Sequence, residues 1–435
     1  MTSSNSEMFS SKIELETTRR YTSEDILVRA RDSNLLKKLQ GDLKMTFNKI
    51  HSNHRGITSL GSNTIPFQPR ILRIPVLLVA MLTSALIATG AATPAAAQSS
   101  PSGSRTFNVD VGYEQVSKGL EAEAFFPDKL TVDVGDQVLF TLRSHEPHTI
   151  TFNAPQPLPD PFMPQPDQNV AANPVIFFPA PAPGGPPANP QDPVNLVVSF
   201  DGTGYVNSGF LQKPGDAFSV SFTKPGTYQV LCLVHPEHMK GTIVVNPAGV
   251  MRPSTDANYR AEAQAQINDY LAKAGDILNS IRVPGPVTNR DGTHTYTVFA
   301  GLGDTAIGID FMRYFGGERL MLKAGDAVTF VMEKNGQGVP HTITFLSGGE
   351  EPDFVIPQPQ ASGPPKLIVN PVALMPAPIP PKPYAGSGYY NSGLLLTGSP
   401  GPQMYTVTFS KPGTYEYLCV LHDEDGMKGT IVVQQ

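Results

Sequence analysis

Hydrophobic and polar residues alternate along much of the chain after residue 105. Between Leu130 and Leu142 the apolar residues fall on every second position on either side of a Gly-Asp turn, and the segment from Leu320 to Phe330 repeats this arrangement. A period of two predicts half-buried strands, and short strands separated by glycine turns are typical of an antiparallel sandwich. We therefore predict an all-β fold for most of the chain.

One segment has a different period. From Ile267 to Ile281 the apolar residues recur at spacings of three and four. Ser254, Thr255 and Asp256 are good N-cap residues before this stretch, and Pro284 cannot continue a helix beyond it. The pattern predicts an amphipathic helix within residues 248–290 that links two strand-rich regions.

The two strand-rich regions are copies of each other. The copies share three motifs, which are the Pro-His-Thr-Ile-Thr-Phe segments 147–152 and 340–345, the Asn-Ser-Gly segments 207–209 and 391–393, and the segments 224–245 and 411–433 that begin with Lys-Pro-Gly-Thr-Tyr. A repeat of this length indicates a duplicated domain. We place the first domain at residues 105–247 and the second at residues 291–435.

Each copy carries a proline-rich insertion after its His-Thr-Ile-Thr-Phe segment. Residues 153–195 hold 14 prolines and residues 346–383 hold 11. Proline cannot donate a hydrogen bond to a strand ladder, so we expect extended segments that lie over the surface of each sandwich.

The N-terminal part differs from the repeats. Residues 1–70 are polar and basic, and we interpret them as a disordered extension or as a mis-assigned start. Within residues 71–97, the stretch 74–97 contains no charge and ends in three alanines, which is typical of a signal peptide cleaved before Gln98. The alternative is an uncleaved membrane anchor, and either interpretation predicts export to the periplasm, the cell surface or the medium.

Charge and cysteine content narrow the function. The formal net charge of −6 argues against nucleic acid as a partner. Cys232 and Cys419 are the only cysteines, too few for a disulfide scaffold. They could form one bridge, but each occupies the same position in its own copy, three residues before a histidine.

The same set of potential metal ligands occurs in each copy. Cys232, His235 and Met239 form a short cluster in the first copy, and Cys419, His422 and Met427 form one in the second. His148 and His341 open a strand about 80 residues earlier. Two imidazoles, a thiolate and a thioether are the donors of a blue-copper site. Core methionines and structural histidines remain the alternatives for single members of these sets.

These motifs resemble the cupredoxins of the plastocyanin/azurin type, which are single-copper electron-transfer sandwiches. The resemblance covers about two-thirds of the chain. It implies two tandem Greek-key sandwiches joined by the helical linker, each with one type 1 copper. The spacing Cys-x2-His-x4-Met of the second copy is the plastocyanin-like one, and the first copy is one residue shorter, so Met239 departs from the pattern. The resemblance also implies that His235 and His422 lie at an exposed copper edge.

The predicted function is electron transfer with unidentified redox partner proteins. Copper storage or delivery would use the same ligands and is the alternative. A multicopper oxidase or nitrite reductase is disfavoured, because no His-x-His element occurs and Leu231 and Leu418, rather than histidines, precede the cysteines. His145 and His238 have no counterpart in the second copy, and we expect both at the surface, with His238 as a substitute ligand for Met239.

The two ligand loops differ in charge. Residues 423–426 add three carboxylates to the second loop, whereas residues 236–238 add one to the first. Negative charge stabilises Cu(II) over Cu(I). From the loops alone we therefore expect the higher reduction potential at the first centre.

Overall fold

The computed structural model describes residues 103–167, 169–180, 197–250, 254–332, 339–378, 382–395 and 404–435. The predicted extension and the predicted signal or anchor segment lie outside these residues. None of the helices in the described ranges is long and apolar enough to cross a membrane.

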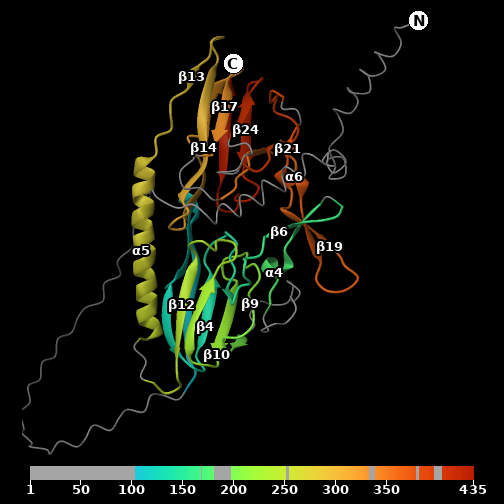
Figure 1. Cartoon of the computed structure of the whole chain (residues 1–435). Coiled ribbons are helices and arrows are strands. Elements are labelled where there is room, and N and C mark those ends of the chain that lie inside the picture. Colours follow the sequence, from blue (N-terminus) through green and yellow to red (C-terminus); the bar gives the residue numbers. More distant parts are fainter. Residues whose placement is uncertain are drawn as a thin grey trace, which may run out of the picture.

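The first repeat folds as two packed sheets (Figure 1). One sheet has the order β2 (Leu120–Phe126), β1 (Thr106–Gln115), β4 (Gln137–Leu142), β10 (Ala217–Phe222), β8 (Val197–Phe200). The other has the order β3 (Lys129–Asp133), β12 (Lys240–Asn246), β11 (Gly226–Leu231), β5 (Thr151–Phe152), β9 (Val206–Asn207). A short 3-10 turn, Val116–Lys118, joins β1 to β2. The inward-facing residues of both sheets form one apolar core, which also contains Cys232 and Met239.

The second repeat has the same two layers. Its first sheet has the order β23 (Met404–Thr408), β17 (Ala327–Val331), β14 (His294–Asp304), β15 (Ile309–Phe315), and β13 (Val287–Thr288) pairs with β14. Its other sheet has the order β16 (Arg319–Lys323), β25 (Lys428–Gln434), β24 (Gly413–Leu418), β18 (Thr344–Phe345), β22 (Tyr390–Ser392), β21 (Pro376–Ala377). Its core contains Cys419 and Met427 in the corresponding places.

The sandwiches are mixed rather than purely antiparallel. β1 pairs with β4 in parallel, and β3 pairs with β12 in parallel. The corresponding strands of the second repeat, β14 with β17 and β16 with β25, do the same. The alternation of side chains predicted the strands correctly, but the pairing depends on which sheet each successive strand joins.

The two repeats share one sheet. β15 of the second repeat pairs antiparallel with β2 of the first, with Ile309 opposite Ala122, Asp310 opposite Glu121 and Phe311 opposite Leu120. This seam joins both first sheets into a single ten-stranded sheet. We call the paired strands β2 and β15 the seam.

Helix α5, Asp256–Ser280, is the predicted linker helix and runs along both repeats (Figure 1). Thr255 caps its N-terminus by accepting a hydrogen bond from the Asn258 N–H at 3.3 Å. Its apolar face packs on the outer face of the seam, where Ile277 meets Leu120 and Phe311 in one buried cluster. The helix therefore covers the junction of the repeats.

The proline-rich insertions also join the repeats. The first contributes β6 (Phe162–Pro164), β7 (Val170–Ala172) and the short helix α4 (Pro174–Phe177). The second contributes β19 (Val355–Gln358), β20 (Lys366–Val369) and the short helix α6 (Pro371–Leu374). β7 pairs with β20 through Ala171 and Ile368, and the four strands form a small separate sheet. The insertions thus contact each other, which their composition did not predict.

Candidate metal centres

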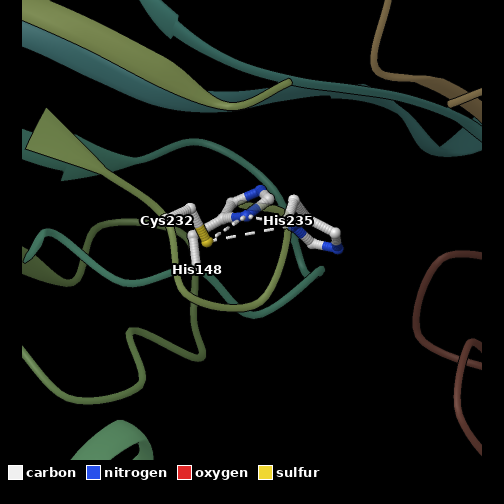
Figure 2. Close-up of side chains that lie close together, drawn as sticks. All are labelled: His148, Cys232 and His235. Carbon is white, nitrogen blue, oxygen red and sulfur yellow. Dashed lines mark hydrogen bonds between the residues drawn. The ribbon is translucent and has the colours of Figure 1, made fainter. Parts of the chain in front are cut away.

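Three predicted ligands of the first repeat converge in its interior. We call the residues His148, Cys232 and His235, with Met239, centre 1. The Nδ1 atoms of the two histidines lie 3.1 Å apart, and the Cys232 Sγ lies 3.8 Å from the first and 3.9 Å from the second. Figure 2 shows both rings turned toward the sulfur. All three residues are buried.

The second repeat builds the same arrangement, which we call centre 2. His341, Cys419 and His422 are buried, with Nδ1 atoms 3.0 Å apart and sulfur-to-nitrogen distances of 4.0 and 3.4 Å. In each centre the three donor atoms lie within 4.8 Å of one another. The repeat therefore duplicates the geometry as well as the sequence.

The two methionines occupy equivalent positions despite the different loop lengths. The Cys232 N–H donates to the Met239 carbonyl at 3.0 Å, and the Cys419 N–H donates to the Met427 carbonyl at 3.1 Å. Both methionine side chains are fully buried. The extra residue of the second loop is accommodated at Gly426, whose φ of 88° favours glycine. The shorter loop therefore does not displace Met239.

The repeated threonines fix the cysteines. The Thr149 N–H donates to the Cys232 sulfur at 3.3 Å, and its hydroxyl accepts the Leu233 N–H at 2.7 Å. Thr342 makes the corresponding contacts with Cys419 and Val420 at 3.3 and 3.0 Å. The sulfur position is thus set by backbone contacts from the strand that also carries the distant histidine.

The Asn-Ser-Gly motif ties each insertion to its centre. The Asn207 amide donates to the Ile176 carbonyl of α4 at 3.0 Å, and its oxygen accepts the Thr151 hydroxyl at 2.9 Å. Asn391 makes the equivalent contacts with Ala373 and Thr344. Because the Thr151 and Thr344 segments follow His148 and His341, the insertions are anchored beside the ligands.

The electrostatics of centre 1 favour a charged thiolate. Burial alone would raise the pKa of the Cys232 thiol, but hydrogen bonds from His148 and His235 outweigh burial and lower this pKa well below its usual value. Burial lowers the pKa of His148, whereas the contacts with Cys232 and Glu121 raise it to about 9. The cluster therefore provides an ionised sulfur ligand.

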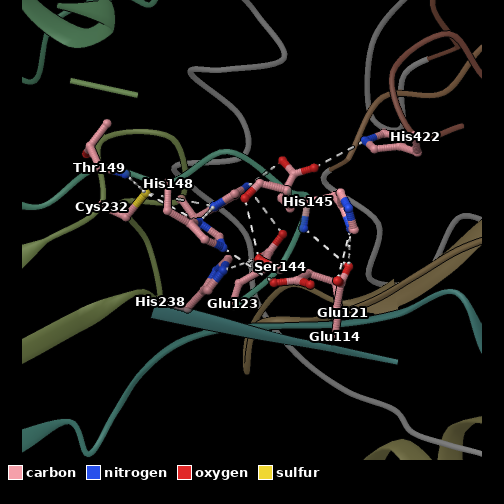
Figure 3. A network of polar contacts seen from close by, with 12 residues as sticks. Glu114, Glu121, Glu123, Ser144, His145, His148, Thr149, Cys232, His238 and His422 are labelled. Carbon is pink, nitrogen blue, oxygen red and sulfur yellow. Dashed lines mark hydrogen bonds and ion pairs between the residues drawn. The ribbon is translucent and has the colours of Figure 1, made fainter. Parts of the chain in front are cut away.

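Buried carboxylates surround the outer nitrogens of the ligand histidines. The Glu121 Oε1 lies 3.4 Å from the His148 Nε2, and the Glu123 Oε1 lies 3.3 Å from the His235 Nε2. Asp310 comes from the paired strand of the seam, and neither of its carboxylate oxygens has a hydrogen-bond partner among the residues that the structure describes. Figure 3 shows this network around centre 1.

Sequence reasoning missed these carboxylates. Glu121 and Glu123 alternate with Leu120, Ala122 and Ala124 along β2, so the pattern resembles a strand with one solvent-facing side. In the structure both sides of β2 are buried, because helix α5 covers the apolar side and the metal-binding loops cover the acidic side. The alternation was the available signal, but it indicated the wrong environment.

The two unmatched histidines lie between the repeats. The expectation that His238 is a surface residue is wrong, because its side chain is 6% exposed and contacts the Glu123 carboxylate. His145 is partly exposed and pairs with Glu114 at 2.9 Å. Glu114, His145 and Asp425 form a third cluster of potential metal ligands. The ion pair between Glu114 and His145 is sufficient to explain why these two side chains lie close together.

His235 and His422, which were expected at an exposed copper edge, do not lie on an outer surface of the protein. His235 is 7% exposed and His422 is 4% exposed, which corrects the expectation of an exposed copper edge. Both line a cavity of about 490 Å³ between the repeats, together with the insertion residues Phe162 and Phe354. The shared sheet turns the two metal-binding ends toward each other, so their edges meet inside the molecule.

The donor set fits a copper ion. First-row metal bonds of about 2.0–2.3 Å to nitrogen and sulfur, arranged trigonally, separate the donor atoms by roughly 3.5–4 Å. The sulfur-to-nitrogen separations of 3.4 to 4.0 Å lie close to this range, and the Nδ1-to-Nδ1 separations of 3.0 and 3.1 Å are shorter. Two histidines and one cysteine with a nearby methionine are the donors of a type 1 copper site.

Comparison with known proteins agrees with this chemistry. Residues 114–246 and 394–434 match the family described as copper binding proteins, plastocyanin/azurin family. The chain is 26% identical over 199 residues to chloroplastic plastocyanin of Physcomitrium patens, covering 46% of this chain and 85% of that protein.

Similar solved structures include a plastocyanin and an amicyanin. Oxidised plastocyanin from Dryopteris crassirhizoma is 24% identical, with 32% of this chain and 99% of that chain covered and a TM-score of 0.18. An oxidised mutant of amicyanin is 20% identical, with 32% and 82% covered and a TM-score of 0.18. Both ligand sets are assembled and part of each repeat matches the plastocyanin/azurin family, which supports a two-domain cupredoxin with a copper site in each domain.

Proposed function

We propose that the protein is an exported electron carrier that holds one type 1 copper in each domain. His148, Cys232, His235 and Met239 would bind the first copper, and His341, Cys419, His422 and Met427 the second. The observation that carries the proposal is the duplicated, buried His2Cys cluster. Bound copper would supply a one-electron Cu(II)/Cu(I) couple at each centre.

The chain's own residues hold each donor in place before metal arrives. The threonine N–H groups fix the sulfur atoms, and the side chains of Glu121 and Glu123 contact the outer nitrogens of the first centre. Histidine ligands oriented in this way keep one tautomer and one ring position. Such rigidity suits rapid electron transfer, because little rearrangement accompanies a change of charge.

Burial favours retention of copper over its delivery. All four imidazoles and both sulfur atoms lie inside the protein, so another protein cannot reach the metal without opening the fold. We therefore place storage and delivery second. Electrons would enter through the cavity where His235 and His422 lie, which makes its rim the contact surface for redox partner proteins. Export rests on the uncharged, apolar stretch 74–97.

The test is a metal count combined with a visible spectrum. We expect two coppers per chain and an intense thiolate-to-copper absorption in the oxidised protein. Cys232→Ser and Cys419→Ser should each remove one copper and about half of the absorption. Two coppers without the thiolate band, or a disulfide between the two cysteines, would contradict the proposal.

A further inference from the structure

One carboxylate lies between the two centres. The Glu146 Oε1 is 3.4 Å from the Nε2 of His235 in the first domain, and its Oε2 is 3.5 Å from the Nε2 of His422 in the second. Glu146 is buried, and each of its oxygens faces one domain. Figure 3 includes His422 in the same polar network as the ligands of centre 1.

Metal binding determines which ring nitrogen faces this carboxylate. In both centres the Nδ1 atoms point to the cysteine sulfur, so a metal bound there leaves the remaining proton on Nε2. An imidazole N–H aimed at a carboxylate fixes the ring and increases its strength as a ligand. Glu146 can therefore accept one hydrogen bond from a ligand of each centre.

The other carboxylates do not have this position. Glu121 and Glu123 contact histidines of the first domain, and the carboxylate oxygens of Asp310 in β15 have no hydrogen-bond partner within the described ranges. Among the described residues, Glu146 alone has ion-pair contacts with ligand histidines of both centres. Asp425 and Glu114 lie nearby and add negative charge, without such a contact to either ring in the described part of the chain.

The repeat explains why a single carboxylate serves both sides. Glu146 precedes Pro147 and His148, and the corresponding residue before Pro340 and His341 is Val339. Val339 is buried and lines the same cavity. A second glutamate there would bring two buried negative charges close together, which is unfavourable. The two domains therefore carry different residues at this position, Glu146 in the first and Val339 in the second.

We propose that Glu146 is a positioning residue shared by the two copper centres. It holds His235 and His422 in their binding orientations, and it transmits a change of charge or occupancy at one centre to the other. This inference rests on the proposed function, because it requires copper at both centres.

The first experiment examines the rings directly. Proton NMR of the Cu(I)-loaded protein should show Nε2–H signals of His235 and His422 at low field and protected from solvent exchange. Glu146→Gln should shift both signals, because the amide cannot accept from both rings, and at least one should exchange faster. The control is Glu424→Gln, which removes an exposed carboxylate from the same cavity and should leave both signals in place.

The second experiment measures the coupling. Cys419→Ser empties centre 2, and we expect it to change the reduction potential of centre 1. In a double-mutant cycle, the change should be smaller in the Glu146→Gln background and unaffected in the Glu424→Gln background. If Glu146→Gln fails to fold, Glu146→Asp keeps the charge but is too short to reach both rings, and it should give the same loss of coupling.

The outcomes separate this inference from the proposed function. Equal changes in the Glu146→Gln and unaltered backgrounds, or unchanged Nε2–H signals, would overturn the shared role while leaving two copper centres intact. An unaltered protein that binds no copper would overturn the proposed function itself and this inference with it.

Discussion

At the scale of single residues, centre 1 is packed so closely that Gly112 has no room for a side chain. Gly112 lies at the bulge of β1 with a φ of 67°. A Cβ added there would lie 2.5 Å from the Ser144 Oγ, 2.7 Å from the His148 Nε2 and 2.8 Å from the Glu121 Oε1. The glycine is thus required by the position of a copper ligand as well as by its backbone angle.

We expect Gly112→Ala to weaken copper binding at centre 1. The methyl group would push His148 or Glu121 out of place, and the positive φ would cost about 1–2 kcal/mol of stability. The measurement is copper affinity of the Cys419→Ser protein, in which centre 1 is isolated. Gly135→Ala is the matched control, because Gly135 has a φ of 92° with open space around it. Equal affinity in both variants would show that the contact with His148 is unimportant.

At the scale of elements, the C-terminal part of helix α5 packs on the seam, whereas its N-terminal part packs on the first domain. Its buried Ile277 belongs to one apolar cluster with Leu120 from β2 and with Ile309 and Phe311 from β15, so this cluster joins the helix to strands of both domains. The seam itself is short, with three paired residues on each strand. The helix therefore supplies apolar contact where the strand pairing is limited.

We expect Ile277→Ala to lower the free energy of unfolding by about 2–5 kcal/mol. The substitution would leave a void at the junction of the two domains, so both domains should lose stability together in one transition. Denaturant unfolding followed by circular dichroism and by the copper absorption measures this. Glu262→Ala, on the exposed face of the same helix, should change stability by no more than about 0.5 kcal/mol. Two transitions, of which only one moves, would indicate that the domains unfold independently.

At the scale of the whole molecule, the joined sheets place the two centres in different electrostatic surroundings. Centre 1 contacts Glu121 and Glu123 in addition to the shared Glu146. Burial raises the pKa of Glu121 to about 8, whereas His235 and His238 outweigh burial and lower the pKa of Glu123, which is therefore the charged one. For centre 2, among the described residues, Glu146 is the one carboxylate with an ion-pair contact to a ligand histidine.

We therefore expect the lower reduction potential at centre 1, the reverse of the order argued from loop charge. Of the loop carboxylates of centre 2, Glu424 is exposed and screened by solvent and salt, and burial raises the pKa of Asp425 to about 6. The buried Glu123, whose pKa is lowered, acts at short range and stabilises Cu(II). Voltammetry of Cys419→Ser and Cys232→Ser, each with a single copper, compares the two centres. Glu123→Gln should raise the potential of centre 1 and leave centre 2 nearly unchanged. A higher potential at centre 1 in the single-copper proteins would show that other contacts outweigh these carboxylates.

The sequence by itself determined the strands, the duplication, the linker helix and the two ligand clusters. These features depend on local periodicity and on short spacings, which remain the same wherever the segment lies. His148 and His341 could be matched with the distant cysteines because the repeat presented the same pairing twice. The short loops from each cysteine to its methionine were also recognisable in the sequence. In the structure, Met239 and Met427 each accept a hydrogen bond from the N–H of the cysteine in their own loop.

Only the tertiary structure decided where the two centres lie relative to each other. A strand such as β2 shows its alternation in the sequence, but not whether its polar side faces water or a neighbouring domain. The pairing of β2 with β15 turned Glu121 and Glu123 inward and buried His235 and His422. Glu146 became a contact of both centres for the same reason, because its second partner, His422, lies 276 positions further along the chain and is brought close by the shared sheet.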